Sequence, residues 1–290
     1  MNSVVRLTAP LLFTVGVMAC AGANQGANPL PCTGASCNPQ PQPLTLVWQD
    51  EFDGAKGTTY DHTKWAADTG GAGFGNQERE FYTTRTDNAA LDGDGHLVIS
   101  ALTEPQPTSY LCWYGACRYT STRLKTQGVI SWTHGRFEAR IRVPRGQGMW
   151  PAFWMLGDNI GTVGWPQCGE IDIMENIGRE PGTVHGTIHG PGYSGGNGIG
   201  RPFTLQSGAF SDDFHVFAVE WRANHVSWYV DGTLYHEMTP ANTPSGTQWV
   251  FEHPFFLLLN FAVGGQWPGD PDVTSTFPQQ MVVDYVRVYQ

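Results

Sequence analysis

The sequence predicts an all-β fold, a sandwich of two antiparallel sheets, from three observations. Turn residues are abundant, with Gly 36 and Pro 20 among 290 residues, and charged residues make up only 14%. Aromatic residues reach 12% of the chain and include Trp 11. No segment sustains a helical period, whereas short alternating runs recur between turn residues. This composition excludes a disordered chain, a coiled coil or helical bundle, and a collagen.

Short runs of alternating apolar and polar residues predict the individual strands. The clearest runs are residues 95–100, 135–142 and 226–230. Asp231-Gly232 separates the last run from another at 233–235, which predicts a hairpin. Many short strands at near-regular spacing are typical of a sandwich. Because no internal repeat or second linker interrupts them, we expect one folded domain, residues 44–290.

The charge balance narrows the classes of ligand. The formal net charge is -10 and the sequence pI is about 5.2. Such a chain lacks the basic surface that follows a phosphate backbone, so we exclude nucleic acid as a partner. An acidic protein rich in tryptophan suits a neutral ligand with flat apolar faces, such as a sugar.

The first 43 residues predict a leader and a spacer. Residues 1–20 contain one charge, Arg6, followed by an apolar stretch. The ending Val17-Met18-Ala19-Cys20 resembles a bacterial lipobox, which predicts a lipid on Cys20; ordinary signal cleavage nearby is the alternative. Residues 21–43 are rich in Ala, Gly, Asn, Pro and Gln and predict an extended linker. We therefore expect a secreted or envelope-anchored bacterial protein that touches a membrane only through this lipid.

The cysteine spacing predicts disulfides rather than a metal site. Cys32/Cys37 and Cys112/Cys117 share one spacing, and each pair could close a small local disulfide in an oxidising compartment. Cys168 would then stay free. Zinc is not expected, because the chain has no Cys-x-x-Cys and its histidines are scattered.

The segment Gly169-Glu170-Ile171-Asp172-Ile173-Met174-Glu175-Asn176 concentrates the chemistry. On a strand, Glu170 and Asp172 share one face, and the isoleucines point to the core. Glu175 has the wrong parity, but one extra residue in a bulge near Met174 would return it to the face of Glu170. The sequence therefore predicts three acids along one wall of a groove.

Three clustered acids suit acid–base catalysis. Each carboxylate raises the pKa of its neighbours. A raised pKa is useful in catalysis where one acid must hold a proton while another stays charged. A retaining glycosidase uses two carboxyl groups about 5–5.5 Å apart. A solvated polar strand face and a calcium site are the alternatives that the residues leave open.

Glu-Ile-Asp-Ile-Met-Glu resembles the Glu-x-Asp-x-x-Glu signature of family 16 glycoside hydrolases, in its laminarinase-like, bulged form. The likeness covers residues 44–290, and other segments resemble that family in the same order. These segments are 48–52, 75–78, 120–123, 135–140, 150–154 and 282–289.

The resemblance implies a concanavalin-like β-jelly-roll with a substrate cleft on its concave face. It also implies a retaining double displacement that needs no cofactor. Glu170 would be the nucleophile, and Glu175 would be the general acid and then the base. Asp172 would lie between them and tune their charge or hydrogen bonding.

The resemblance also points to residues that contact sugar. Trp150 and Trp154 share a strand face, where core packing is the ordinary role of a tryptophan, and the resemblance favours sugar stacking. Asn76 and Glu78 resemble polar contacts to bound sugar. Arg123 resembles an arginine that reaches the cleft.

Further cleft residues are expected on either side of the acid strand. Trp165 leads directly into it, and His189, at the end of the run 183–189, resembles a histidine near the leaving-group side. Cys168 has the parity of Glu170, although a small packing residue is its ordinary role. The glycine-rich loop 191–198 would form a mobile rim over the substrate. Residues expected on the far wall are Asn260, Gln266 and Trp267.

Many members of this family hold a structural calcium away from the cleft. Glu51, Gly95 and Asp284 resemble its ligands. Carboxylate and carbonyl oxygens are the ligands that hard cations prefer. This possibility rests on the resemblance.

We expect a monomeric, secreted endo-β-glucanase that cuts β-1,3 linkages in laminarin-like glucans. The first alternative is another polysaccharide, such as mixed-linkage glucan, agar, carrageenan or a galactan. The bulged motif disfavours the dedicated mixed-linkage enzymes, and Lys+Arg of only 16 disfavours sulfated substrates. The second alternative is a non-catalytic carbohydrate-binding module, against which the intact Glu170 and Glu175 argue.

Overall fold

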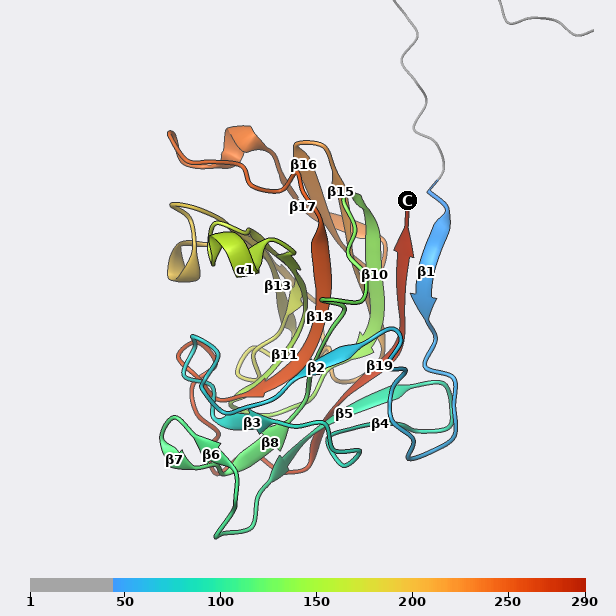
Figure 1. Ribbon diagram of the computed structural model, residues 1–290, viewed down its shortest axis with the longest axis vertical. Helices are drawn as coiled ribbons and strands as arrows, with labels where there is room; N and C mark the ends of the chain where they lie inside the picture. The colour runs from blue at the N-terminus through green and yellow to red at the C-terminus, as the bar shows by residue number, and fades with distance from the viewer. Residues whose placement is uncertain (1–43) are drawn as a thin grey trace, which may run out of the picture. The chain divides into compact units, whose positions relative to one another are not determined.

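Two stacked β-sheets dominate the structure, a computed structural model that describes residues 44–290 (Figure 1). Across the ten-stranded sheet the order is β17 (Thr233–Met238), β16 (His225–Val230), β15 (His215–Arg222), β10 (Gly135–Arg142), β19 (Gln279–Tyr289), β5 (Leu97–Thr103), β8 (Tyr119–Ser121) and β3 (Glu80–Tyr82), with β1 (Leu46–Asp50) beside β19 and β4 (Ala89–Leu91) beside β5. Across the seven-stranded sheet the order is β14 (Ile199–Thr204), β13 (Thr183–His189), β12 (Glu170–Glu175), β11 (Met149–Gly157), β18 (Phe255–Val263), β9 (Arg123–Lys125) and β2 (Ala66–Asp68).

This architecture confirms the all-β sandwich that the composition predicts. The predicted hairpin is the antiparallel pair β16–β17, which turns at Asp231-Gly232. One pair departs from the antiparallel prediction, because β3 and β8 run parallel. The remaining elements of residues 44–290 are short: β6 (Leu111–Cys112), β7 (Gly115–Ala116), α1 (Ile160–Val163), and the 3-10 turns Gly195–Asn197 and Pro240–Asn242.

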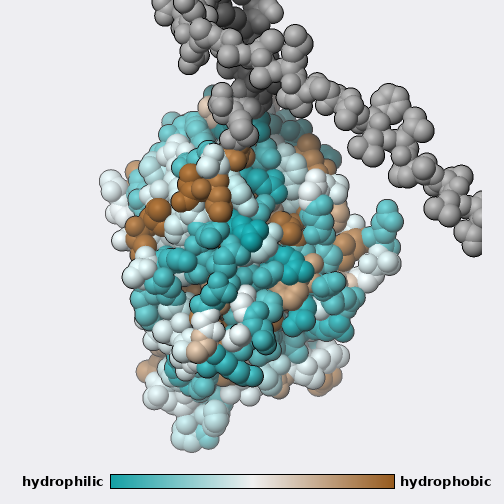
Figure 2. Space-filling view, turned by 90° about the vertical axis from the view of Figure 1, so that its right-hand side faces the viewer, coloured by the Kyte–Doolittle hydropathy of each residue, from teal (hydrophilic) through white to brown (hydrophobic). Residues whose placement is uncertain are grey.

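Alternation along the strands builds the core between the sheets. On β10, Phe137 and Ile141 are fully buried, whereas Arg136 and Arg140 point outward. Strands whose side chains alternate in this way place one face on the core and one face in water. Figure 2 shows the side of the molecule near β1 and β19, which is mainly hydrophilic with small, separate apolar patches.

The disulfide prediction is confirmed where the structure describes it. Cys112 and Cys117 are bonded and join β6 to β7, and Cys168 is free and buried. The predictions for Cys20, for the pair Cys32/Cys37 and for the leader and linker of residues 1–43 lie outside the described residues. All described residues, 44–290, belong to one compact unit. Within them, no helix has the length and apolar character needed to cross a membrane.

Candidate active site

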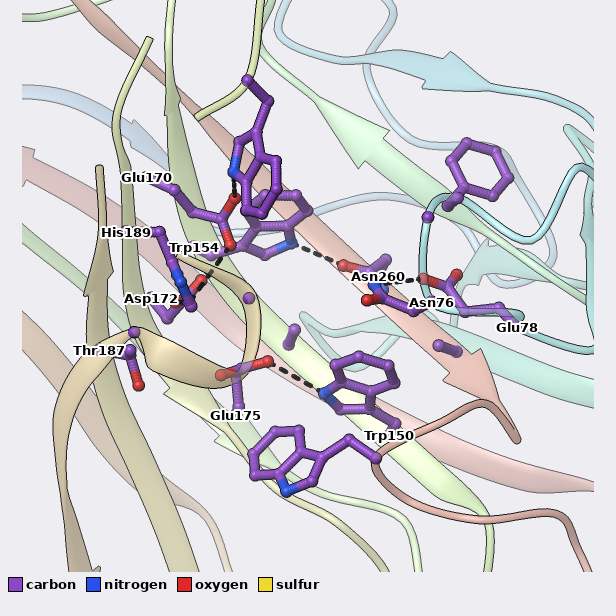
Figure 3. A pocket seen from close by; sticks show the side chains of 18 of the residues that line it. Asn76, Glu78, Trp150, Trp154, Glu170, Asp172, Glu175, Thr187, His189 and Asn260 are labelled. Carbon is purple, nitrogen blue, oxygen red and sulfur yellow. Dashed lines mark hydrogen bonds and ion pairs between the residues drawn. The ribbon is translucent and has the colours of Figure 1, made fainter. Parts of the chain in front are cut away.

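A cleft of about 910 Å³ lies on the face of the seven-stranded sheet that is turned away from the core. Strands β11, β12, β13 and β18 contribute its central side chains (Figure 3), and loops contribute most of the other lining residues. The ten residues predicted to act on substrate all line it: Asn76, Glu78, Arg123, Trp150, Trp154, Trp165, Glu170, Asp172, Glu175 and His189.

The predicted bulge is present in β12. Against β11, Trp154 pairs with Asp172 and Phe153 pairs with Met174, so the register skips Ile173. Against β13, the register also shifts between Asp172 and Glu175. A bulge adds one residue to one strand and reverses the parity beyond it. Glu175 therefore joins Glu170 and Asp172 on the cleft face.

Glu170 and Glu175 each accept a hydrogen bond from a separate indole donor. Trp165 Nε1 donates to Glu170 Oε2 at 2.7 Å, and Trp150 Nε1 donates to Glu175 Oε1 at 3.1 Å (Figure 3). Asp172 has no such donor. A hydrogen bond from a neutral N–H stabilises a carboxylate without adding a charge to the site.

Burial raises the pKa of all three acids. The pKa of Glu170 rises to about 8, first through burial and then through the charge of Asp172. Burial raises the pKa of Asp172 to about 7. Burial, followed by the charge of Asp172, holds the pKa of Glu175 well above its ordinary value of 4.5. The cleft therefore holds fewer than three negative charges at neutral pH.

His189 makes the two glutamates unequal. Its Nε2 atom lies 3.1 Å from Asp172 Oδ2 and 3.9 Å from Glu170 Oε1. On the neighbouring strand His189 stands opposite Glu170, whereas Glu175 stands opposite His185. The charge of the imidazole lowers the pKa of both glutamates, but His189 faces Glu170 directly across the two strands. Glu175 is thus the better place for a proton and Glu170 for a charge.

A chain of hydrogen bonds supports the opposite wall of the cleft. Asn76 Nδ2 donates to Glu78 Oε1 at 3.2 Å, and the Tyr82 hydroxyl donates to Glu78 Oε2 at 2.9 Å. Asn260 Nδ2 donates to the Tyr82 oxygen at 3.1 Å and accepts from Trp154 Nε1 at 2.7 Å (Figure 3). Trp154 is therefore fixed in the cleft by a polar partner.

Arg123 is part of the cleft wall. Its Nε atom donates to Asp68 Oδ2 at 3.0 Å. Its guanidinium group lies 4.8 Å from the ring centre of Trp154 and 5.0 Å from that of Phe74. The charge is paired and both neighbouring rings are held in place, so Arg123 shapes the wall as well as offering donors to a ligand.

The cleft tryptophans differ in how much of each ring is exposed to a ligand. Trp165 is 45% exposed, whereas Trp150 is 9% exposed and packs against Ile177 and Ala262. Trp150 thus combines packing with its position in the cleft. Cys168 has the packing role: it is fully buried among Leu156, Phe256 and Leu258, and burial raises its pKa to about 11.

Several lining residues were not predicted from the sequence. Thr187 lies on β13 between His185 and His189, so the period of two along that strand could have identified it. Phe74 lies in the glycine-rich loop, where no pattern marks one residue above another. The predicted rim loop does reach the cleft through Gly195, Gly196 and Gly198, and Asn260, Gln266 and Trp267 also line it, as expected. The other unpredicted lining residues are Gly75, Ala152, Leu156, Ile160 and Ala262.

The residues predicted to bind calcium lie apart from the cleft. Arg287 binds both carboxylate oxygens of Glu51 at 2.8 Å, and Arg140 binds the carboxylate of Asp284. Both carboxylates are therefore paired with arginines in this structure, and the structural calcium stays a prediction. Within residues 44–290 the one grouping with metal-ligand spacing is Glu170, Asp172 and His189, whose ligand atoms lie within 4.8 Å of one another. These three residues are among those predicted to line the active site.

The site defines a glycosidase: an acid that holds a proton and a second carboxylate lie together in a cleft lined by indole rings. The chain belongs to a family with this chemistry. The family described as Glycosyl hydrolases family 16 matches residues 77–287.

Individual relatives agree with the family. A β-glucanase of Rhodothermus marinus is 45% identical over 253 residues, which cover 84% of this chain and 85% of that protein. The catalytic domain of an endo-1,3-β-glucanase (laminarinase) from Thermotoga petrophila RKU-1 is 48% identical with a TM-score of 0.78, covering 85% of this chain and 98% of that one. An endo-β-1,3-glucanase from Pyrococcus furiosus is 49% identical with a TM-score of 0.79, and the match covers 85% of this chain and 94% of that one.

Two neighbours on β11 give a matched test of the two faces of the sheet. Trp154→Ala removes a ring from the cleft and should lower kcat/KM on a glucan at least tenfold, with little change in melting temperature. Phe153→Ala empties a fully buried core position and should cost about 3–5 kcal/mol of unfolding free energy. Urea denaturation and initial rates check both. A larger stability loss at Trp154 than at Phe153 would place Trp154 in the core.

The raised pKa of Glu170 predicts a pH-dependent gain in stability for Glu170→Gln. A carboxyl with a folded-state pKa of about 8 and an ordinary pKa of 4.5 binds its proton more tightly in the folded state. It therefore destabilises the fold progressively as the pH rises between these two values. The variant should exceed the wild type in melting temperature more at about pH 9 than at about pH 5. A difference that is the same at both pH values would contradict the burial of this charge.

Proposed function

We propose that the protein is an endo-acting β-1,3-glucanase that hydrolyses laminarin-like glucans with retention of anomeric configuration. The observation that carries this proposal is the bulged strand β12, which places Glu170 and Glu175 on one cleft face with separate indole donors. The named relatives that share most of the chain are β-glucanases, which supports this substrate class.

The reaction proceeds in two steps, each involving both glutamates. In the first step, Glu175 gives its proton to the glycosidic oxygen while the Glu170 carboxylate attacks the anomeric carbon. The leaving sugar departs as an alcohol, and a glycosyl ester remains on Glu170. In the second step, the Glu175 carboxylate takes a proton from water, whose oxygen attacks the anomeric carbon and releases Glu170. Asp172 and His189 adjust the charge at Glu170 and need no cofactor to do so.

The charges of the cleft support a neutral polymer as substrate. Within residues 44–290, Arg123 is the only lysine or arginine that lines the cleft, and its guanidinium is paired with Asp68. A sulfated polysaccharide would need unpaired cations along its path. We also propose that the enzyme acts as a monomer, since the cleft of a single chain already contains every residue predicted to act on substrate.

Purified enzyme on a panel of laminarin, mixed-linkage glucan and cellulose tests the substrate and the stereochemistry together. Laminarin should be cut fastest, with a rapid fall in mean chain length from internal cleavage. Proton NMR of the earliest products should show the β-anomer before mutarotation. An initial α-anomer would contradict the retaining assignment of Glu170, and a lack of laminarin cleavage would overturn the substrate proposal.

We propose that a lipid on Cys20 anchors the enzyme at the bacterial envelope, because the segment before it resembles a lipobox. The full chain, expressed in a bacterial host with radioactive palmitate, should carry the label and sediment with membranes. Cys20→Ser should lose the label and become soluble. Unlabelled wild-type protein free in the medium would instead mean ordinary secretion.

A further inference from the structure

The bulge that makes the site leaves part of strand β12 without regular ladder pairing. The register shifts on both sides of β12, against β11 between Asp172 and Met174 and against β13 between Asp172 and Glu175. A bulge interrupts the ladder at the extra residue and bends its strand. Regular pairing resumes at Glu175, with Ala152 on one side and His185 on the other. The direction of its side chain therefore depends on how the bulge just before it is held.

A tryptophan from the opposite sheet supplies such a contact. Trp228, on β16 of the ten-stranded sheet, is fully buried. Its indole Nε1 crosses the core and donates to the backbone carbonyl oxygen of Asp172 at 2.7 Å. This carbonyl stands at the first residue of the register shift. The bond therefore ties the start of the bulge to the other layer of the sandwich.

A glycine opposite the bulge gives the indole its space. Gly186 lies on β13 between His185, which pairs with Glu175, and Thr187, which pairs with Asp172. A Cβ atom at Gly186 would lie 2.4 Å from Trp228 Cδ1 and 2.8 Å from Nε1. The φ angle of Gly186 is not in the left-handed region, so its backbone conformation does not require glycine. What this position requires is the absence of a side chain beside the indole.

A stacked ring holds the plane of the indole. The rings of Trp228 and His236 lie 4.9 Å apart at 27°, and the two residues pair across β16 and β17. Burial lowers the pKa of His236, so the stacked imidazole is neutral at neutral pH and brings no charge beneath the catalytic strand. The indole N–H is thus held toward Asp172 by its neighbours on two strands.

From this geometry we infer that Trp228 is a positioning residue for catalysis: its N–H fixes the Asp172 carbonyl and thereby the bulge that aims Glu175 at the glycosidic oxygen. The inference rests on the proposed glycosidase function for its kinetic consequence. Because a misplacement of about 1 Å can cost about 100-fold in rate, a small relaxation of the bulge should weaken proton donation by Glu175.

Trp221 provides a matched control. It is fully buried on the adjacent strand β15, and its Nε1 donates to the backbone oxygen of Phe251 at 2.9 Å and not to a residue of β12. Trp228→Phe and Trp221→Phe therefore remove the same kind of bond and a similar volume from one core. Only the first variant removes a bond to the catalytic strand.

The two variants are compared on two substrates by kcat/KM, which reports the first chemical step. Laminarin has a poor leaving group that needs the proton of Glu175, whereas 2,4-dinitrophenyl β-laminaribioside has one that does not. Trp228→Phe should lose about 100-fold on laminarin and far less on the aryl glycoside. Trp221→Phe should stay near wild type on both, although its melting temperature also falls. Equal losses in both variants, or equal losses on both substrates, would overturn the inference.

Hydrogen exchange provides a readout that does not depend on activity. Amides of residues 172–176 should exchange faster in Trp228→Phe than in Trp221→Phe, and equal exchange would contradict the positioning role. If Trp228→Phe does not fold, benzothienylalanine at position 228 keeps the fused ring and removes only the N–H, and the same expectations apply to it. A wild-type protein that cleaves neither substrate would contradict the proposed function, while the exchange result would still decide the role of Trp228.

Discussion

The structure depends on keeping three carboxyl groups side by side in a place that is largely closed to water. Asp172 is 2% exposed and lies on the same strand face as Glu170 and Glu175. Burial and mutual repulsion both oppose their ionisation. This unfavourable free energy of ionisation makes proton donation possible, because acids that cannot all ionise must retain at least one proton. The indole donors, His189 and the bulge together determine which acid retains this proton.

The rest of the sandwich provides the rigidity that this strand lacks. The core between the sheets includes fully buried rings such as Phe153, Phe217 and Trp221. The strands on both sides of β12 keep a regular register with their outer partners β18 and β14, so the irregular pairing is confined to a few residues. The cleft face then accepts polar and charged groups that would be costly in the core. Stability comes from one face of the seven-stranded sheet and chemistry from the other.

Much of this arrangement could be predicted from the sequence because a strand has a period of two. That rule placed Glu170 and Asp172 together, and the single extra residue before Glu175 predicted the bulge that the register shows. The substrate residues came from the ordered likeness to a family rather than from any local rule. A local pattern does not give partners that lie far along the chain, so the pairing of Arg123 with Asp68 and the arginines that hold Glu51 and Asp284 emerged only from the fold.

Contacts between the sheets were the least predictable part. The parallel pair β3–β8 depends on how distant segments meet. The sequence pattern predicts Trp228 to be an ordinary core residue of a strand, and the structure places it in the core. Its hydrogen bond to the Asp172 carbonyl forms only because the two sheets stack in this way. The need for glycine at position 186 likewise becomes clear only when the neighbouring Trp228 indole is seen. These residues support the site from the side that the substrate never reaches.

The central claim is that Glu170 is the nucleophile and that Glu175 supplies and recovers the proton. Incubation with a 2-deoxy-2-fluoro laminaribiosyl fluoride, followed by proteolysis and mass spectrometry, tests it most directly, because the fluorine slows release of a covalent intermediate. We predict one glycosyl adduct per chain, carried by Glu170. An adduct on Asp172 or Glu175, or full turnover of the reagent with inversion and without any adduct, would contradict the account.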